Sequence, residues 1–296
     1  MANLKDIKRQ IGSVSNTQKT TRAMKLVSTA KLRRAEELAK RSRLFANKTN
    51  EMIGEIAARI KCSKVGGIES RFFAELDSPK MIDIVFVTAD KGLCGGFNIQ
   101  TIKAVKKVMS EYKDKKVKVR LRGIGKKGIA FFKYNEIELL DAISDLSSAP
   151  DMTRSSEFIA RSINDFKDGV IDGVYIIYNG YKNIITQELH VNKVLPASSS
   201  EYDCKDEDKK SQLEVEAEDE EKMLESLIVK YVEYNMYYAL IDSVAAEHSA
   251  RMQAMDAATN NAKEMVKTLN VKYNKARQES ITTELIEIIS GVESMK

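Results

Sequence analysis

The C-terminal part of this chain, from about Leu213 to Met295, contains nothing that would interrupt a helix. No proline follows Pro196, and no glycine lies between Gly180 and Gly291. The stretch is rich in Ala, Leu, Met, Lys and Glu, which all favour a helix. Its apolar residues recur at alternating steps of three and four, which is typical of a coiled-coil seam. The positions of this C-terminal seam are Leu224, Leu227, Tyr231, Tyr234, Tyr238, Ile241, Ala245, His248, Met252, Met255, Thr259, Ala262, Val266, Leu269, Tyr273 and Ala276.

The N-terminal stretch 1–60 has the same rhythm, with two glycines and no proline. A helix of about eighty residues spans roughly 120 Å, so the C-terminal helix must project from any globular domain and needs a partner helix. We therefore predict an antiparallel two-stranded coiled coil of the two chain ends, with the middle of the chain inserted at one end. The positions of the N-terminal seam are Leu4, Ile7, Ile11, Val14, Gln18, Thr21, Lys25, Ser28, Leu32, Ala35, Ala39, Ser42, Ala46, Thr49, Ile53, Ile56 and Ile60.

Counting along this coiled coil gives a register and an overhang. If Ile60 lies near residue 213, Met1 lies near residue 272, and about twenty C-terminal residues, or roughly 30 Å of helix, have no partner. An apolar tip of this kind needs another protein to cover it. The apolar residues of the overhang are Ile281, Leu285, Ile286, Ile288, Ile289 and Val292.

Charge is distributed unevenly, although the net charge is only +5. Residues 1–48 carry thirteen Lys and Arg against three acids, and residues 201–225 carry twelve acids against four Lys. A basic helix could bind nucleic acid through its phosphates. We favour instead a solvated face or a collar for acidic protein loops, because the charges go round the helix and no aromatic residues interleave. The collar consists of Arg22, Lys25, Lys31, Arg33 and Arg34, with Met24 among them.

Several functional classes are disfavoured by composition. Cys62, Cys94 and Cys204 have no paired spacing and no nearby histidine, so we expect neither a metal site nor a disulfide framework, as suits a reducing cytosol. No apolar run approaches the eighteen residues of a membrane span. Because the seam begins at Leu4, we expect no signal or transit peptide.

The middle of the chain has the composition of a compact domain and alternates strands with helices. This order predicts a Rossmann-like α/β domain over residues 79–196, with a largely parallel sheet closed by a hairpin, between coiled-coil helices over 1–61 and 210–296. The turn before the last strand is expected at Asn179-Gly180. The expected elements are strand Met81–Ala89, helix Asn98–Lys113, strand Lys116–Leu121, helix Lys126–Tyr134, strand Ile137–Ile143, a helix capped by Asp151 or Thr153 and ending near Phe166, strand Val174–Tyr178 and strand Ile184–Leu195.

One glycine motif in this domain could bind a dinucleotide. Gly123–Gly128 reads G-x-G-x-x-G between a strand and a helix, and Asp141 follows at a rough distance for a ribose contact. The chain would then be a Rossmann-type nucleotide-binding oxidoreductase with a coiled-coil oligomerisation arm. We favour a tight strand-to-helix turn, because Lys126 and Lys127 occupy positions where the helix would pack on the sheet and no catalytic set accompanies the motif.

A second glycine loop, Asp90–Phe97, lacks the G-x-x-x-x-G-K-[ST] pattern of a phosphate cradle and is interpreted as a structural turn. Cys94 lies in this loop near Lys91, but no base is close in sequence, so a packed cysteine is favoured over a nucleophile. We expect no catalytic residue and no cofactor.

Four segments carry a resemblance to a known family. They are Tyr273–Gly291 (YNKARQESITTELIEIISG), Asn16–Met24 (NTQKTTRAM), Ala89–Asn98 (ADKGLCGGFN) and Glu247–Thr259 (EHSARMQAMDAAT). Together they closely resemble the γ subunits of F-type ATP synthases, of the bacterial type. The family usually has Ala after the glycine of the C-terminal motif, where this chain has Val292.

The resemblance implies the central rotor shaft of a proton-translocating ATP synthase. In the family, the coiled coil stands inside a ring of three α and three β subunits, and the α/β domain forms a foot with the ε subunit on the membrane ring of c subunits. Such a shaft is not catalytic alone. It couples ring rotation to conformational change at β and so governs ATP synthesis, hydrolysis and proton flow. The implied location is peripheral, on the cytoplasmic face of a bacterial plasma membrane, without a membrane span or nucleic acid.

Residue roles also carry over from the family. Arg277, Gln278 and Thr282 match positions that hydrogen-bond a β-subunit loop, while Met24 and the collar match the region that faces acidic loops of β. Glu216 is a counterpart of a residue that contacts the c ring. The residues expected in a hydrophobic sleeve of α and β are Ile281, Leu285, Ile288 and Ile289.

Overall fold

The computed structural model describes residues 4–62, 71–73, 78–197 and 220–295. The chain forms two compact units, one of residues 1–29 with 251–296 and one of residues 30–250. Two long helices, α1 (Leu4–Cys62) and α5 (Glu220–Glu293), each contribute to both units. This confirms the two terminal helices expected from the seams.

The unit of residues 30–250 is built on a five-stranded sheet in the order β3-β2-β1-β4-β5. Strands β1 to β4 pair in parallel, and β5 pairs antiparallel with β4, so the expected parallel sheet closed by a hairpin is confirmed. The strands are β1 (Met81–Val87), β2 (Lys118–Ile124), β3 (Asp141–Ile143), β4 (Gly173–Tyr181) and β5 (Gln187–Leu195). The shorter helices are α2 (Phe97–Asp114), α3 (Lys126–Tyr134) and α4 (Met152–Lys167).

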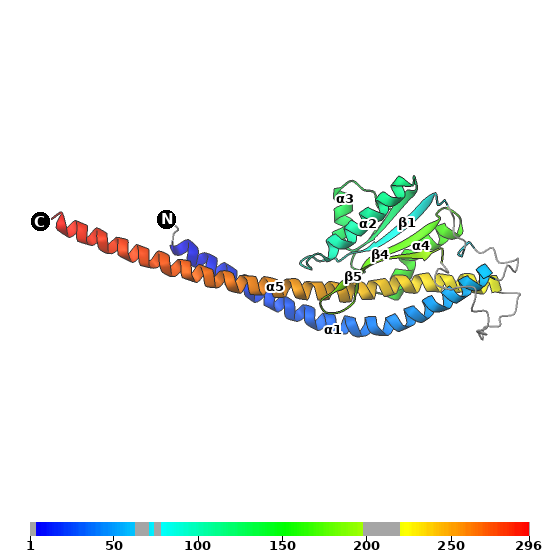
Figure 1. Cartoon of the computed structure of the whole chain (residues 1–296), viewed down its shortest axis with the longest axis horizontal. Helices are drawn as coiled ribbons and strands as arrows, with labels where there is room; N and C mark the ends of the chain where they lie inside the picture. Colours follow the sequence, from blue (N-terminus) through cyan, green and yellow to red (C-terminus); the bar gives the residue numbers. More distant parts are fainter. Residues whose placement is uncertain (1–3, 63–70, 74–77, 198–219, 296) are drawn as a thin grey trace. The chain divides into compact units, whose positions relative to one another are not determined.

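The central strand β1 is buried on both faces, which explains its continuous apolar run. Ile84 and Phe86 pack in the core beneath α2 and α3, whereas Val85 and Val87 pack in the core beneath α4 and α5. The sheet is therefore the middle of three layers, with helices on both faces (Figure 1). Asp151 caps α4 by accepting from the backbone N–H of Arg154, as the sequence suggested.

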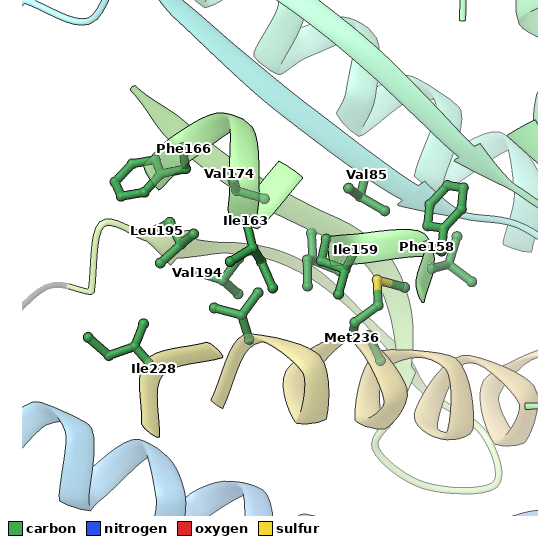
Figure 2. Close-up of a cluster of buried hydrophobic side chains, with 14 of the residues drawn as sticks. Val85, Phe158, Ile159, Ile163, Phe166, Val174, Val194, Leu195, Ile228 and Met236 are labelled. Carbon is green, nitrogen blue, oxygen red and sulfur yellow. The ribbon is translucent and has the colours of Figure 1, made fainter. Parts of the chain in front are cut away.

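Helix α5 buries a face that seam analysis did not reveal. Ile228, Val232 and Met236 follow each other at steps of four and belong to the same core as α4, β4 and β5. Figure 2 shows Ile228 and Met236 reaching from α5 towards the side chains of Ile159 and Val194. These positions lie off the predicted seam, so this part of α5 has two apolar faces, one for α1 and one for the α/β domain.

The expected turn at Asn179-Gly180 is wrong, because both residues lie inside β4. The Asn179 amide is fully buried and donates to the Phe97 carbonyl at 2.8 Å, which anchors the start of α2. A Cβ on Gly180 would overlap the Asp242 carboxylate of α5 and stand 2.6 Å from the His190 ring. Glycine is thus required here for close approach of a helix to a strand and not for a turn.

In the unit of residues 1–29 and 251–296, the predicted seam is confirmed but its register is displaced. The hydroxyls of Thr21 and Thr259 are 2.8 Å apart, whereas the expected register placed residue 252 opposite Thr21. The displacement is seven residues (259 less 252), which is one heptad. The expectation assumed that the second helix begins near residue 213, but the described part of α5 begins at Glu220.

We predict that Gly180→Ala lowers the free energy of unfolding by about 1–3 kcal/mol, because the added methyl group overpacks the contact between β4 and Asp242. Thermal unfolding of the whole chain would measure the change. Gly12→Ala is a matched control, because an added Cβ there meets nothing within 4 Å. This change should raise the free energy of unfolding by up to about 1 kcal/mol, since Ala favours a helix more than Gly does. Equal effects of the two changes would contradict the close approach at Gly180.

Candidate functional site

The C-terminal end of α5 presents an apolar surface. Every described residue from Ile281 onward is exposed, and Ile281, Leu285 and Ile288 are 50%, 54% and 63% exposed. They follow steps of four and three, so they lie on one side of the helix. Within the unit of residues 1–29 and 251–296, the displaced register places Leu4 opposite about residue 276. The nineteen described residues that follow, 277–295, therefore extend beyond the described start of α1, close to the overhang of about twenty residues expected. We call Ile281, Leu285, Ile286, Ile288, Ile289 and Val292 the apolar tip.

Polar residues predicted to contact a partner lie directly before the apolar tip. Arg277, Gln278 and Thr282 are exposed. Gln278 and Thr282 lie one turn apart on one side of α5, and the Thr282 hydroxyl donates to the Gln278 carbonyl at 2.9 Å. The Arg277 guanidinium forms no salt bridge with any residue in the described ranges. Its donors therefore remain available for a carboxylate or carbonyl on another chain.

The collar residues of this same unit differ in exposure and in ion pairing. Arg22 is exposed and Met24 is half-buried. Lys25, in contrast, forms an ion pair with Asp256 of α5 at 2.6 Å. Because Asp256 offsets the charge of Lys25, Arg22 is the collar residue of this unit whose charge is more available to an acidic partner. Sequence reasoning missed Asp256, because the pairing depends on the register.

The remaining collar residues belong to the unit of residues 30–250. Lys31, Arg33 and Arg34 are exposed on α1. None of the three has a salt bridge within the described part of the chain. Three unpaired cations within four residues favour an acidic contact surface. Glu216, the expected c-ring contact, lies outside the described residues.

The glycine motif Gly123–Gly128 forms the tight turn favoured above. At Gly125, φ is +99° and a Cβ would overlap the Thr88 carbonyl oxygen. The Asp90 carboxylate accepts from the backbone N–H of Lys126 at 3.0 Å, at the start of α3. A helix start is where this fold would hold a phosphate, and here a carboxylate of the chain itself occupies that place.

The ribose candidate Asp141 and the thiol candidate Cys94 are also engaged within the chain. Asp141 accepts from Arg122 at 2.9 Å, and its second basic neighbour is Arg161 at 3.7 Å. Cys94 is buried, with its sulfur 3.2 Å from the Asn98 amide nitrogen. The structure therefore favours structural roles for both residues.

A buried ionic network between the sheet and α4 was not predicted. Asp83 is fully buried and accepts two hydrogen bonds from Arg120, at 2.6 and 2.9 Å. Arg120 also donates to Asp165, and its hydrogen bond to Asp83 is the largest cause that raises the pKa of Arg120. Arg122 is 1% exposed, and burial lowers its pKa despite the pairing with Asp141. Charged residues inside otherwise apolar strands, Asp83 in β1 and Arg120 and Arg122 in β2, were the signal in the sequence that could have indicated this network. Only the pairing register of the two strands shows that these side chains meet.

The described residues contain no group of three or more His, Cys, Asp or Glu side chains placed to hold a metal ion. None of the helices in the described part of the chain has the length and hydropathy of a membrane-spanning helix.

Comparison with known proteins gives a consistent result over the whole length. The family described as ATP synthase matches residues 3–295. The ATP synthase gamma chain of Sulfurimonas denitrificans is 75% identical over 296 residues, with all of both chains covered. That of Wolinella succinogenes is 58% identical over 298 residues and covers 100% of this chain and 99% of the relative.

Solved structures share the fold at low identity. A chain in the rotor of the Euglena gracilis mitochondrial ATP synthase covers 94% of this chain and 98% of its own length, at 17% identity and a TM-score of 0.64. A second chain, from the same enzyme with its c-ring, covers 99% and 94% at 18% identity and a TM-score of 0.67.

We predict that Asp83→Asn lowers the free energy of unfolding by about 3 kcal/mol, because it breaks a buried ion pair and leaves Arg120 short of a partner. Urea unfolding of the whole chain would measure the loss. Asp114→Asn, at the exposed end of α2, should change it by less than about 0.5 kcal/mol. A similar small change in both variants would mean that the buried network does not stabilise the fold.

Proposed function

Because the chain belongs to the family of ATP synthase gamma chains, we propose that it is the central rotor shaft of a proton-translocating ATP synthase. The chain itself performs no catalytic step. Its role is to couple rotation of the c ring to conformational change in the β subunits, where ATP is made or hydrolysed. The match over residues 3–295 is the observation that carries this proposal.

We infer that the apolar tip turns inside a hydrophobic sleeve formed by the α and β subunits. The support is an exposed apolar stripe that no described residue covers. Apolar contact suits a rotating tip, because it is non-directional and favours no single angle. Arg277, Gln278 and Thr282, which precede the tip, are proposed to hydrogen-bond a loop of β.

The basic residues are proposed to face acidic loops of β, in each unit separately. In one unit the contact would use Arg22 and Met24, with Lys25 contributing less because Asp256 already pairs with it. In the other unit it would use the unpaired cations of Lys31, Arg33 and Arg34. Such contacts are screened by salt, so they would change with ionic strength.

The remaining partners are placed at the α/β domain. We propose that this domain forms a foot on the ε subunit and the c ring, with Glu216 as the c-ring contact. We also propose a peripheral position on the cytoplasmic face of a bacterial plasma membrane, and the bacterial origin of the relatives supports this.

Affinity purification of the tagged chain from its own membranes, followed by native mass determination, tests the proposal. We expect one copy of the chain with three α subunits, three β subunits and ε. Recovery of the chain alone, or with nucleic acid, would overturn the rotor assignment.

A variant of the apolar tip tests the sleeve. Replacing Ile281, Leu285 and Ile288 by Gln keeps helix propensity but removes apolar area. The free energy of association with the α and β subunits should become less favourable by about 2–4 kcal/mol. Titration of the α–β ring with chain variants, followed by native mass determination, would measure this.

The matched control places Gln at Glu279, Thr283 and Glu287, on the opposite side of the helix. It should associate like the unchanged chain. Equal association of both triple variants would argue against burial of the stripe.

A further inference from the structure

Arg43 of α1 joins three elements of the unit of residues 30–250. Its Nη2 donates to the Tyr181 carbonyl of β4 at 2.6 Å and to Asp242 Oδ1 of α5 at 3.2 Å. Its Nε donates to the Tyr238 hydroxyl of α5 at 3.0 Å. One planar side chain therefore links a strand of the foot with both long helices. We call Arg43, Tyr181, Tyr238 and Asp242 the Arg43 junction.

The junction is a built site and not a chance surface contact. The Asp242 side chain is 1% exposed, and its burial raises the pKa of the carboxyl group, while the charge of Arg43 opposes this rise. Gly180 lacks the Cβ that would occupy the place of the carboxylate. A buried carboxylate is costly without a cation, so Asp242 and Arg43 depend on each other.

A second contact ties the same strand end to α1. Tyr181 is buried, and its phenol lies beside the Glu36 carboxylate, about two turns before Arg43 on α1. Burial is the largest cause that raises the pKa of Tyr181, and the nearby Glu36 carboxylate adds to it. The end of β4 is thus held to α1 by polar contacts at two points.

The two long helices meet the foot through different kinds of contact here. Helix α5 packs on α4 and the sheet through Ile228, Val232 and Met236, and such apolar contact is non-directional. At the Arg43 junction, α1 is held by charge-assisted hydrogen bonds with fixed geometry. Apolar packing resists separation, whereas the guanidinium fork also resists sliding and rotation of α1 against β4.

We propose that the Arg43 junction is the point at which torque passes from the sheet of the foot into both long helices together. The inference rests on the proposed rotor function and adds positioning residues to it. A tangential force on the sheet reaches α5 through its apolar face and α1 through the guanidinium fork. Without the fork, α1 would follow only through its seam with α5 and through the contact of Tyr181 with Glu36.

Arg43→Met tests this, because Met keeps an unbranched chain and removes the donors. In the assembled complex in inverted membrane vesicles, ATP-driven proton pumping should fall relative to ATP hydrolysis. In single complexes with the α–β ring fixed, a probe on the foot should show broader angular fluctuations. The torsional stiffness between the foot and the two helices should fall, since α1 then takes up torque only indirectly. Arg43→Lys, which keeps one donor and the charge, should recover part of both readouts.

Two further variants keep the test decisive. Arg41→Met removes an exposed cation from the same helix turn and should leave pumping and stiffness unchanged. Arg43→Met combined with Asp242→Asn avoids a buried unpaired charge, so it should fold and assemble even if the single variant does not. An assembled double variant with the pumping ratio and stiffness of the unchanged chain would overturn the inference.

The failure of this inference is distinguishable from failure of the rotor proposal. If the unchanged chain does not assemble with α and β subunits, the rotor proposal fails. If the unchanged complex pumps protons and the assembled variants match it, only the role of the Arg43 junction fails.

Discussion

Both long helices must keep one stripe of side chains away from water, and the rest of the structure depends on this constraint. Alternating steps of three and four hold the stripe on one side of a helix over many turns. In the unit of residues 1–29 and 251–296, Ile7 of α1 and Met255 and Ala262 of α5 are buried in this way. In this unit the described part of α1 begins opposite about residue 276 of α5. The constraint that builds the seam therefore leaves the apolar tip, which lies further along α5, without a partner in the described residues.

The sequence could predict the existence of the seam but not its register. Shifting two heptad helices by seven residues again places seam positions opposite seam positions, so the apolar pattern fits two registers equally well. Polar side chains remove this ambiguity, because Thr21 and Lys25 need the partners Thr259 and Asp256. Those pairs connect residues far apart in sequence, and nothing local identifies them. The exposed tip was predictable because it required only that the second helix be longer.

The α/β domain was predicted well where the signal is local and poorly where it is tertiary. The bounds of α3 and the cap of α4 follow from neighbouring residues. In contrast, Asn179-Gly180 has the composition of a turn, yet it lies in a strand because α5 crosses close to it. The second apolar face of α5 was also missed, since apolar residues around residues 228–240 are so dense that a seam accounts for only some of them. Likewise, the glycines of Gly123–Gly128 fit both a nucleotide loop and a tight turn until Asp90 is seen at the start of α3.

A rotor shaft needs two opposite kinds of contact, and we propose that the chain supplies both. Where the shaft turns against other subunits, contacts must not favour one angle, and aliphatic side chains such as Ile281 and Leu285 would meet this need because their burial is non-directional. Where the foot drives the shaft, contacts must not slip, and a guanidinium fork on a carboxylate and a carbonyl would meet that need because its geometry is fixed. Burying Asp242 is costly, and an apolar pair would be cheaper for stability alone. We therefore attribute the charged pair of Arg43 and Asp242 to its directionality. Hydrogen bonds of fixed geometry resist sliding between α1, α5 and β4, which apolar packing would not.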